Sequence, residues 1–144
     1  MKKYIKKILI LCTCMTMILH ISPVSASNSG TTGIARGTYM SSSTVYGKII
    51  NEDDVVGRAV VTCLSQVREI DVRMYLQRAY GTTWQNVTSA YNMKAYDIAE
   101  FDESAIIRNV SPGTYRIYIE VMVTGYDGLW DSVGVGTGAF VINT

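Results

Sequence analysis

The sequence predicts an all-β fold: a single antiparallel β-sandwich of about seven strands, preceded by a helical signal peptide. Three observations support this class. Tyr, Val, Ile and Thr dominate from Ile34 onward, and these residue types are enriched in strands. Several segments alternate apolar and polar residues with a period of two, whereas runs with helical periodicity are scarce. Turn-forming residues separate these segments at short intervals, which is typical of small antiparallel domains.

Residues 1–26 have the pattern of a secretory signal peptide. Four lysines precede an apolar run from Ile8 to Ile21, and Val24-Ser25-Ala26 supplies small residues at the two positions that a signal peptidase recognises. The apolar run is 14 residues long, shorter than the roughly 20 residues that span a bilayer. We therefore expect cleavage after Ala26 and a secreted, extracellular protein with no membrane contact in its mature form.

The 118 residues left after cleavage are enough for one domain with a sizeable core. Nine Lys and Arg against twelve Asp and Glu give this part a net charge of −3, so its charge does not favour nucleic acid as a partner. His20, Cys12 and Cys14 all lie within the predicted signal. The mature domain is therefore expected to lack histidine-dependent chemistry, and Cys63 has no partner for an intrachain disulfide.

The first segments of the mature chain are assigned by composition and alternation. Residues 27–33 are rich in Ser, Thr and Gly, which predicts a flexible leader, and the sandwich domain is expected over residues 34–144. A strand is predicted near Val55 to Leu64. Its apolar face carries Ala59, Val61 and Cys63.

A second strand is predicted from Ile70 to Arg78, with alternate side chains on opposite faces. The inward set is Ile70, Val72, Met74 and Leu76, and the outward set is Asp71, Arg73, Tyr75 and Gln77. Gly81 interrupts the pattern, so Ile70–Ala79 and Thr83–Tyr91 are expected to form a hairpin. From Met93 to Arg108 we expect one or two short strands, with a bend at Asp102-Glu103.

The clearest strand is Tyr115 to Thr124. Its inward set is Tyr115, Ile117, Ile119, Val121 and Val123, and its outward set is Arg116, Tyr118, Glu120 and Met122. Asp127-Gly128 is the strongest hairpin signal in the chain and joins this strand to a last one, about Leu129 to Ile142. Gly134, Gly136 and Gly138 recur on one face of that last strand, which predicts a twisted edge or the close approach of another segment.

Two patterns resemble known proteins. The run Val110-Ser111-Pro112-Gly113-Thr114-Tyr115 resembles the tyrosine corner of immunoglobulin and fibronectin type III sandwiches, where the phenol bonds back to the upstream backbone. The alternative is an ordinary turn followed by a core tyrosine. A longer pattern resembles small exported single-domain β-sandwich proteins of Gram-positive bacteria, through Cys63-Leu64-Ser65, Ile70-x-Val72, Leu76-Gln77, Gly81-x-x-Trp84-x-x-Val87 and Pro112-Gly113-Thr114-Tyr115. That resemblance implies the sandwich fold and export, and it brings no assigned activity.

Few residues point to chemistry. Cys63 alternates with apolar neighbours, which favours a buried core thiol over a reactive one. Glu52-Asp53-Asp54 and the pair Asp127 and Asp131 supply carboxylates of the kind that bind Ca²⁺ in loops. Neither group has the spacing of a recognised calcium loop, so solvated loops are favoured, and Asp127 and Asp131 are only weak metal candidates. No cofactor and no catalytic residue is predicted.

The predicted binding surface is the loop around Tyr126, Asp127 and Trp130, because exposed aromatic residues stack on sugar rings and anchor protein interfaces. Trp84 is expected instead to cover an end of the sandwich or to pair across strands. The leading hypothesis is a secreted, non-enzymatic binding domain for a glycan or a protein. The alternatives are a small exported toxin or bacteriocin-like effector, a self-assembling surface or matrix protein, and a hydrolase that uses paired carboxylates.

Overall fold

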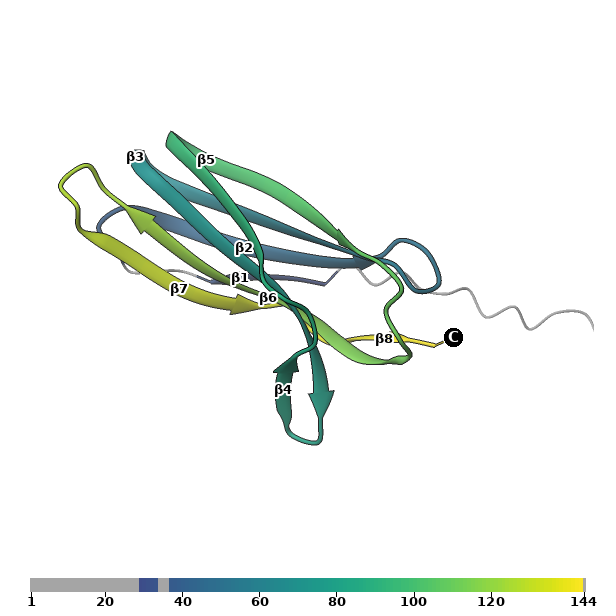
Figure 1. The fold of residues 1–144 in the computed structure, drawn as a ribbon. Coiled ribbons are helices and arrows are strands. Elements are labelled where there is room, and N and C mark those ends of the chain that lie inside the picture. Colours follow the sequence, from purple (N-terminus) through teal and green to yellow (C-terminus); the bar gives the residue numbers. More distant parts are fainter. Residues whose placement is uncertain (1–28, 34–36, 144) are drawn as a thin grey trace, which may run out of the picture.

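A computed structural model describes residues 29–33 and 37–143, and the predicted signal peptide lies outside these described residues. The described residues form eight strands and pair only in antiparallel fashion (Figure 1). The strands are β1 (Ser29–Gly33), β2 (Met40–Ile49), β3 (Val55–Tyr80), β4 (Thr83–Asn86), β5 (Tyr91–Ile107), β6 (Gly113–Thr124), β7 (Trp130–Gly136) and β8 (Phe140–Ile142). The all-β antiparallel class is therefore confirmed, and within the described ranges no helix has the length and apolarity to cross a membrane.

One continuous sheet contains all eight strands. Its main path is β1-β2-β3-β6-β7, with β4 and β5 on β3 and β8 on β6. Residues 29–33, expected to be a flexible leader, instead form β1 and pair with β2 from Ser29↔Gly47 to Gly33↔Ser43. The sheet therefore begins upstream of the predicted domain boundary at residue 34.

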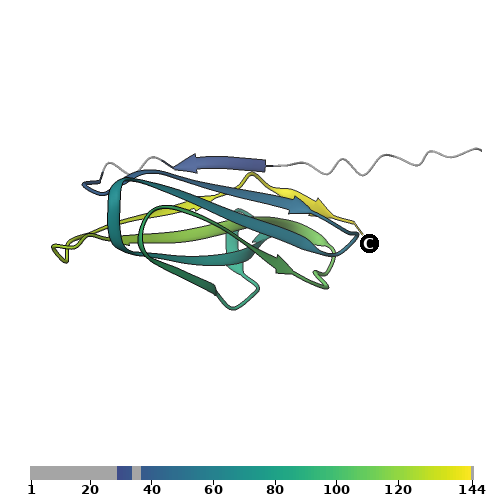
Figure 2. The ribbon, with the colours of Figure 1, turned by 90° about the horizontal axis from the view of Figure 1, so that it is seen from above.

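Strand β3 is the central strand of the fold. The two strands predicted within it, Val55–Leu64 and Ile70–Arg78, are halves of one strand of 26 residues. Between them, residues 63–66 of β3 lie opposite the single residue Ala99 of β5. Extra residues on one strand bend it and increase its twist, so β3 turns a corner here, and Figure 2 shows the ribbon folding over at that end.

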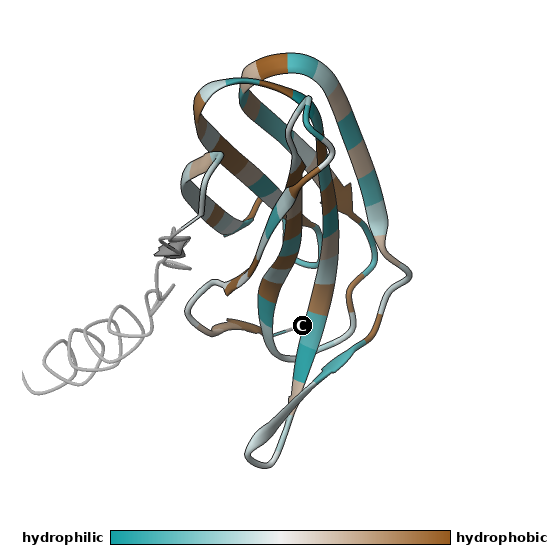
Figure 3. Cartoon of the chain, turned by 90° about the vertical axis from the view of Figure 1, so that its left-hand side faces the viewer, coloured by the Kyte–Doolittle hydropathy of each residue, from teal (hydrophilic) through white to brown (hydrophobic). Residues whose placement is uncertain are grey.

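The corner brings the two halves of β3 face to face around the core. A Cβ placed on Gly57, in the first half, would lie 2.5 Å from Sδ of Met74 in the second half. A larger residue at position 57 would require the Met74 side chain to move. The alternating apolar side chains of β3 and β6 belong to the hydrophobic core. The alternation itself is visible as brown and teal bands along the ribbon in Figure 3. The inward sets predicted for these strands are all buried, which confirms their alternation: Ile70, Val72, Met74, Leu76, Tyr115, Ile117, Ile119, Val121 and Val123.

Strand β5 differs from its prediction. The segment expected to hold one or two short strands is a single strand of 17 residues. Its irregularity lies between Ile98 and Glu100, opposite the corner of β3, and not at Asp102-Glu103. Asp102 is instead paired in register with Val60, and its carboxylate binds the guanidinium of Arg58.

The hairpins follow the turn signals. Gly81 and Gly128 both have positive φ, 62° and 83°, in the two predicted turns. The second arm of the first hairpin, β4, is shorter than expected, and the hairpin projects from the sheet (Figure 1). The predicted last strand is two strands, β7 and β8. The ladder breaks at Thr137, where the Ile117 N–H bonds to the side-chain Oγ1 of Thr137 at 3.0 Å.

Tyr115 makes the local hydrogen bond expected of a tyrosine corner. Its hydroxyl donates to the Ser111 carbonyl at 2.8 Å, and the side chain is 2 % exposed. Its ring lies 6.5 Å, centroid to centroid, from that of Phe140 in β8. The bond fixes the entry into β6, the strand that carries much of the candidate site.

Candidate functional site

The loop between β6 and β7 carries the residues predicted to bind a ligand. Tyr126 and Trp130 are 59 % and 62 % exposed. The Leu129 N–H bonds back to Oδ1 of Asp127 at 3.1 Å, and the Gly125 N–H bonds to the Leu129 carbonyl at 2.9 Å. Each end of the loop is therefore closed by its own hydrogen bonds, and the aromatic side chains project from a defined turn.

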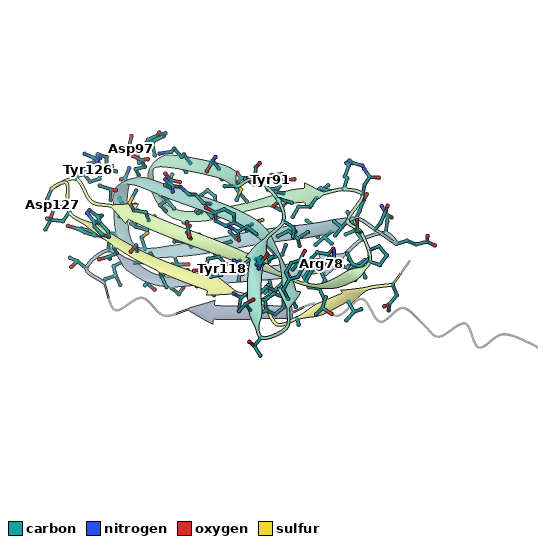
Figure 4. The ribbon with its side chains drawn as sticks, turned by 60° about the horizontal axis from the view of Figure 1, so that its bottom comes forward. Arg78, Tyr91, Asp97, Tyr118, Tyr126 and Asp127 are labelled. Atoms are coloured by element: carbon teal, nitrogen blue, oxygen red, sulfur yellow. The ribbon has the colours of Figure 1, made fainter. Side chains whose placement is uncertain are left out.

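Two further hydrogen bonds anchor this loop to distant segments. The Tyr126 hydroxyl donates to Oδ1 of Asp97 in β5 at 2.6 Å, and the Tyr39 hydroxyl donates to Asp127 at 2.5 Å. Figure 4 shows Asp97, Tyr126 and Asp127 together at one end of the molecule. The bond to Asp127 raises the pKa of Tyr39 to about 12 and, from the other side, lowers the pKa of Asp127.

Asp131, at the start of β7, fastens the segment that leads into β2. Its carboxylate accepts the backbone N–H groups of Thr38, Tyr39 and Met40 at 3.2, 2.7 and 3.0 Å. Burial raises the pKa of Asp131, but these three hydrogen bonds outweigh it, so the net pKa lies below the ordinary value. Asp127 and Asp131 thus serve as structural acceptors that hold two parts of the chain together.

An open cavity of about 440 Å³ lies on the outer face of β3, β6 and β7. This volume falls within the roughly 300–1,000 Å³ of small-molecule sites. We call it the sheet-face cavity. The side chains that line it and could contact a ligand are those of Asp71, Arg73, Tyr118, Glu120, Trp130 and Ser132. Of the three predicted binding residues, only Trp130 belongs to it, because Tyr126 and Asp127 lie in the loop beyond.

Asp71 is the most buried polar side chain of the cavity. It was predicted to face outward, and it does lie on the outer face, but it is only 6 % exposed. Its Oδ2 pairs with Nζ of Lys94 in β5 at 2.9 Å. Its Oδ1 is buried and accepts no hydrogen bond from any residue that the structure describes. A buried acceptor without a partner costs about 1–3 kcal/mol, and this cost falls on the folded state.

Charges around the floor are nearly balanced. Lys94 also binds Oε1 of Glu69 at 2.5 Å, and the hydrogen bonds that its ammonium group donates to these two carboxylates raise the pKa of Lys94. Arg73 and Glu120 are register partners on β3 and β6. The exposed Glu120 also accepts the Tyr75 hydroxyl at 3.2 Å. The cavity therefore offers an Arg donor and carboxylate acceptors side by side.

The glycines of β7 make room for long side chains from β6. A Cβ on Gly134 would lie 2.1 Å from the hydroxyl oxygen of Tyr118, so the phenol lies directly across this position. The close approach predicted for the glycine-rich strand is therefore confirmed at Gly134, and the approaching group is a side chain. The Arg116 guanidinium lies 5.4 Å from the Tyr118 ring centre and 4.7 Å from that of Trp84. Trp84 thus packs across strands, as expected.

The other candidate groups have structural surroundings. Cys63 is 7 % exposed, and burial raises its pKa to about 11, which confirms the core interpretation. In the acidic cluster, Asp54 is buried and accepts the Asn109 N–H at 3.2 Å and the Asn51 amide at 3.2 Å. Among the residues with described positions, no three His, Cys, Asp or Glu side chains converge in a way that could hold a metal ion.

Sequence reasoning found Trp130 but missed the polar residues that line the cavity with it. Asp71, Arg73, Tyr118 and Glu120 were placed on outer faces of two strands, which is correct, but nothing in one strand indicates which strand lies next to it. The signal that could have found the site is the recurrence of charged and aromatic residues at outward positions in two adjacent predicted strands. No known protein family, no curated protein and no solved structure matches this chain.

Proposed function

We propose that this protein is a secreted, non-enzymatic binding domain that contacts a glycan or a protein around Trp130. One observation carries the proposal: an aromatic side chain that is 62 % exposed lines an open cavity of about 440 Å³ together with Arg73 and Tyr118. Exposed Trp is a frequent anchor of binding surfaces. The tethered hairpin holds it in place before binding, which lowers the entropic cost of association.

The non-enzymatic part of the proposal rests on how the loop carboxylates are used. The carboxylate oxygens of Asp127 and Asp131 already accept hydrogen bonds from residues 38–40 and from their own loop. A pair of carboxylates that acts on a substrate needs free oxygens facing one cleft. This end of the molecule is therefore better suited to binding a ligand than to hydrolysing one.

Secretion and the fold type belong to the same proposal. The lysine-rich start, the apolar run and Val24-Ser25-Ala26 support export and cleavage after Ala26. An immunoglobulin-like sandwich is supported by the Tyr115–Ser111 bond and by the facing halves of β3. The resemblance of the sequence to small exported β-sandwich proteins of Gram-positive bacteria agrees with this fold type. Such sandwiches commonly bind ligands through loops and exposed faces.

A ligand screen with two variants tests the proposal. The purified protein is applied to a glycan array and to an array of extracellular proteins. Trp130→Ala should abolish binding to at least one ligand, whereas Tyr80→Ala, at the distal hairpin and 48 % exposed, should preserve it. The proposal is refuted if neither array gives a bound ligand, or if every ligand binds the Trp130→Ala variant as well as the unmodified protein.

A further inference from the structure

The most exposed large apolar side chains of the described residues gather at one end of the molecule. They come from the corner of β3, from β5 and from the loop between β6 and β7, and we call this surface the apolar end. Its members are 58–68 % exposed: Leu64, Tyr96, Tyr126, Leu129 and Trp130. Exposed apolar surface that is gathered in one place marks an interaction site more often than scattered residues do.

Hydrogen bonds hold the three segments of the apolar end together. The Leu64 N–H donates to the Tyr39 carbonyl at 2.8 Å, and the Tyr39 hydroxyl donates to Asp127, which links the corner of β3 to the loop. The Tyr126 hydroxyl donates to Asp97, which links the loop to β5. The surface is therefore ordered before it meets a partner, and this order lowers the entropic cost of association.

Acidic side chains lie around the apolar end. Asp97, Glu100 and Asp127 are exposed there, and they outnumber Arg68, the exposed cation that follows the corner of β3. Two apolar ends that faced each other would bring these carboxylates together, and like charges in an interface cost binding free energy. The surface that fits is therefore one with exposed aromatic side chains and a positive charge.

The hairpin formed by β3 and β4 has this complementary character. The chain from Leu76 to Asn92 contains no Asp or Glu. Arg78 lies at the base of the hairpin, and the Arg116 guanidinium packs 4.7 Å from the ring centre of Trp84 in β4. Neither guanidinium is ion-paired with a carboxylate of a described residue. Tyr80 is exposed beside them, and Figure 4 shows Arg78 well away from the apolar end.

We propose that the apolar end of one molecule docks on the β3–β4 hairpin of a second copy of this chain. This inference rests on the proposed binding function, because Trp130 belongs to the apolar end, and it names the protein that this surface contacts. The two surfaces differ, so a pair of copies still has one free apolar end and one free hairpin. Repetition of such a head-to-tail contact gives a ring or a filament.

Sedimentation velocity of the purified protein over a range of concentrations tests the inference. Association should increase with concentration and should weaken at high salt, because the complementary charges are exposed. Leu129→Asp places a charge in the apolar end and should weaken association by about tenfold or more. Ile50→Asp makes the same change at an exposed position between β2 and β3, outside both surfaces, and should associate normally.

A second variant blocks the hairpin. Thr82→Glu combined with Gln85→Glu adds two carboxylates at exposed positions, and Gln85 is the register partner of Arg78. Thermal unfolding shows whether each variant is folded. Each blocked variant should be monomeric at concentrations where the unmodified protein associates. An equimolar mixture of the two should form a dimer and nothing larger, because only one intact apolar end and one intact hairpin can meet.

A protein that stays monomeric at every concentration overturns the inference. So does association that survives in both blocked variants, or a mixture of the two that stays monomeric. If the unmodified protein is monomeric but an array ligand is still lost with Trp130→Ala, the binding function stands and only the identity of the partner is wrong.

Discussion

Replacing Tyr115 by Phe removes one hydrogen bond and almost nothing else. The hydroxyl donates to the Ser111 carbonyl at 2.8 Å, and the side chain is 2 % exposed. The ring keeps its contact with Phe140 at 6.5 Å and its place beneath the Arg78 guanidinium at 5.7 Å, because Phe has the same shape. Any change in stability therefore reports on the hydrogen bond between Tyr115 and Ser111.

The size of the effect follows from the partners of that bond. A neutral hydrogen bond contributes about 0.5–1.5 kcal/mol to stability. Ser111 is exposed, so its carbonyl can bind water once the phenol is gone, and the larger penalty of an orphaned buried acceptor does not apply. We expect a loss of about 1 kcal/mol, which lowers the unfolding temperature of a domain of this size by roughly 4 °C.

Urea denaturation is the appropriate assay, with Tyr80→Phe as the control. The Tyr80 ring also lies 5.7 Å from the Arg78 guanidinium, but its side chain is 48 % exposed. The control should stay within about 0.5 kcal/mol of the unmodified protein. Tyr115→Phe should lower the midpoint while leaving the m-value unchanged. Equal midpoints for the two variants would refute the idea that the Tyr115 hydroxyl stabilises the entry into β6.

Three further outcomes are expected. Cys63, buried and with its pKa raised to about 11, should resist a thiol reagent in the folded protein and react on unfolding; rapid labelling of the native state would contradict this. The pKa values of Asp127 and Asp131 are lowered in the folded state, so their ionised forms stabilise the fold above about pH 4 and this stabilisation is lost as pH falls through the folded-state pKa values. Asp131→Asn should therefore flatten the acid side of a plot of urea midpoint against pH. An unchanged plot would count against the role of Asp131 in holding residues 38–40. Arg58→Met should leave the urea midpoint nearly unchanged in the same assay, because its ion pair with Asp102 is about half exposed on both sides and is screened by solvent; a clear drop in the midpoint would show otherwise.

Period-two alternation predicted the strands that bury one face. In β6 every inward position from Tyr115 to Val123 is buried, because each apolar side chain points into a core that any antiparallel fold must form. The turn at Asp127-Gly128 could likewise be predicted from the sequence, since glycine is the residue that adopts positive φ without strain. Both signals act within a few residues, so one sequence is enough to detect them.

Features that depend on distant partners escaped prediction. β5 is an edge strand whose side chains are mostly exposed, so its alternation is weak and its length could not be recognised. Asp71 is buried because Lys94, Met122 and their neighbours surround it from other strands. The continuity of β3 through residues 63–66 depends on its pairing with β5 along both halves. Only the three-dimensional arrangement supplies this information.

The 26-residue strand β3 also has a consequence for how the chain folds. Four strands, β2, β4, β5 and β6, pair directly with it, and its two halves supply opposite sides of one core. Neither half can form its side of the core alone, so unfolding should be a single cooperative transition without a stable partial structure. Forming a pairing such as Val55↔Ile107 closes a long loop, and the entropic cost of this closure comes before the pairing stabilises the chain. Folding should accordingly take milliseconds to seconds, as in other proteins dominated by non-local strand pairing.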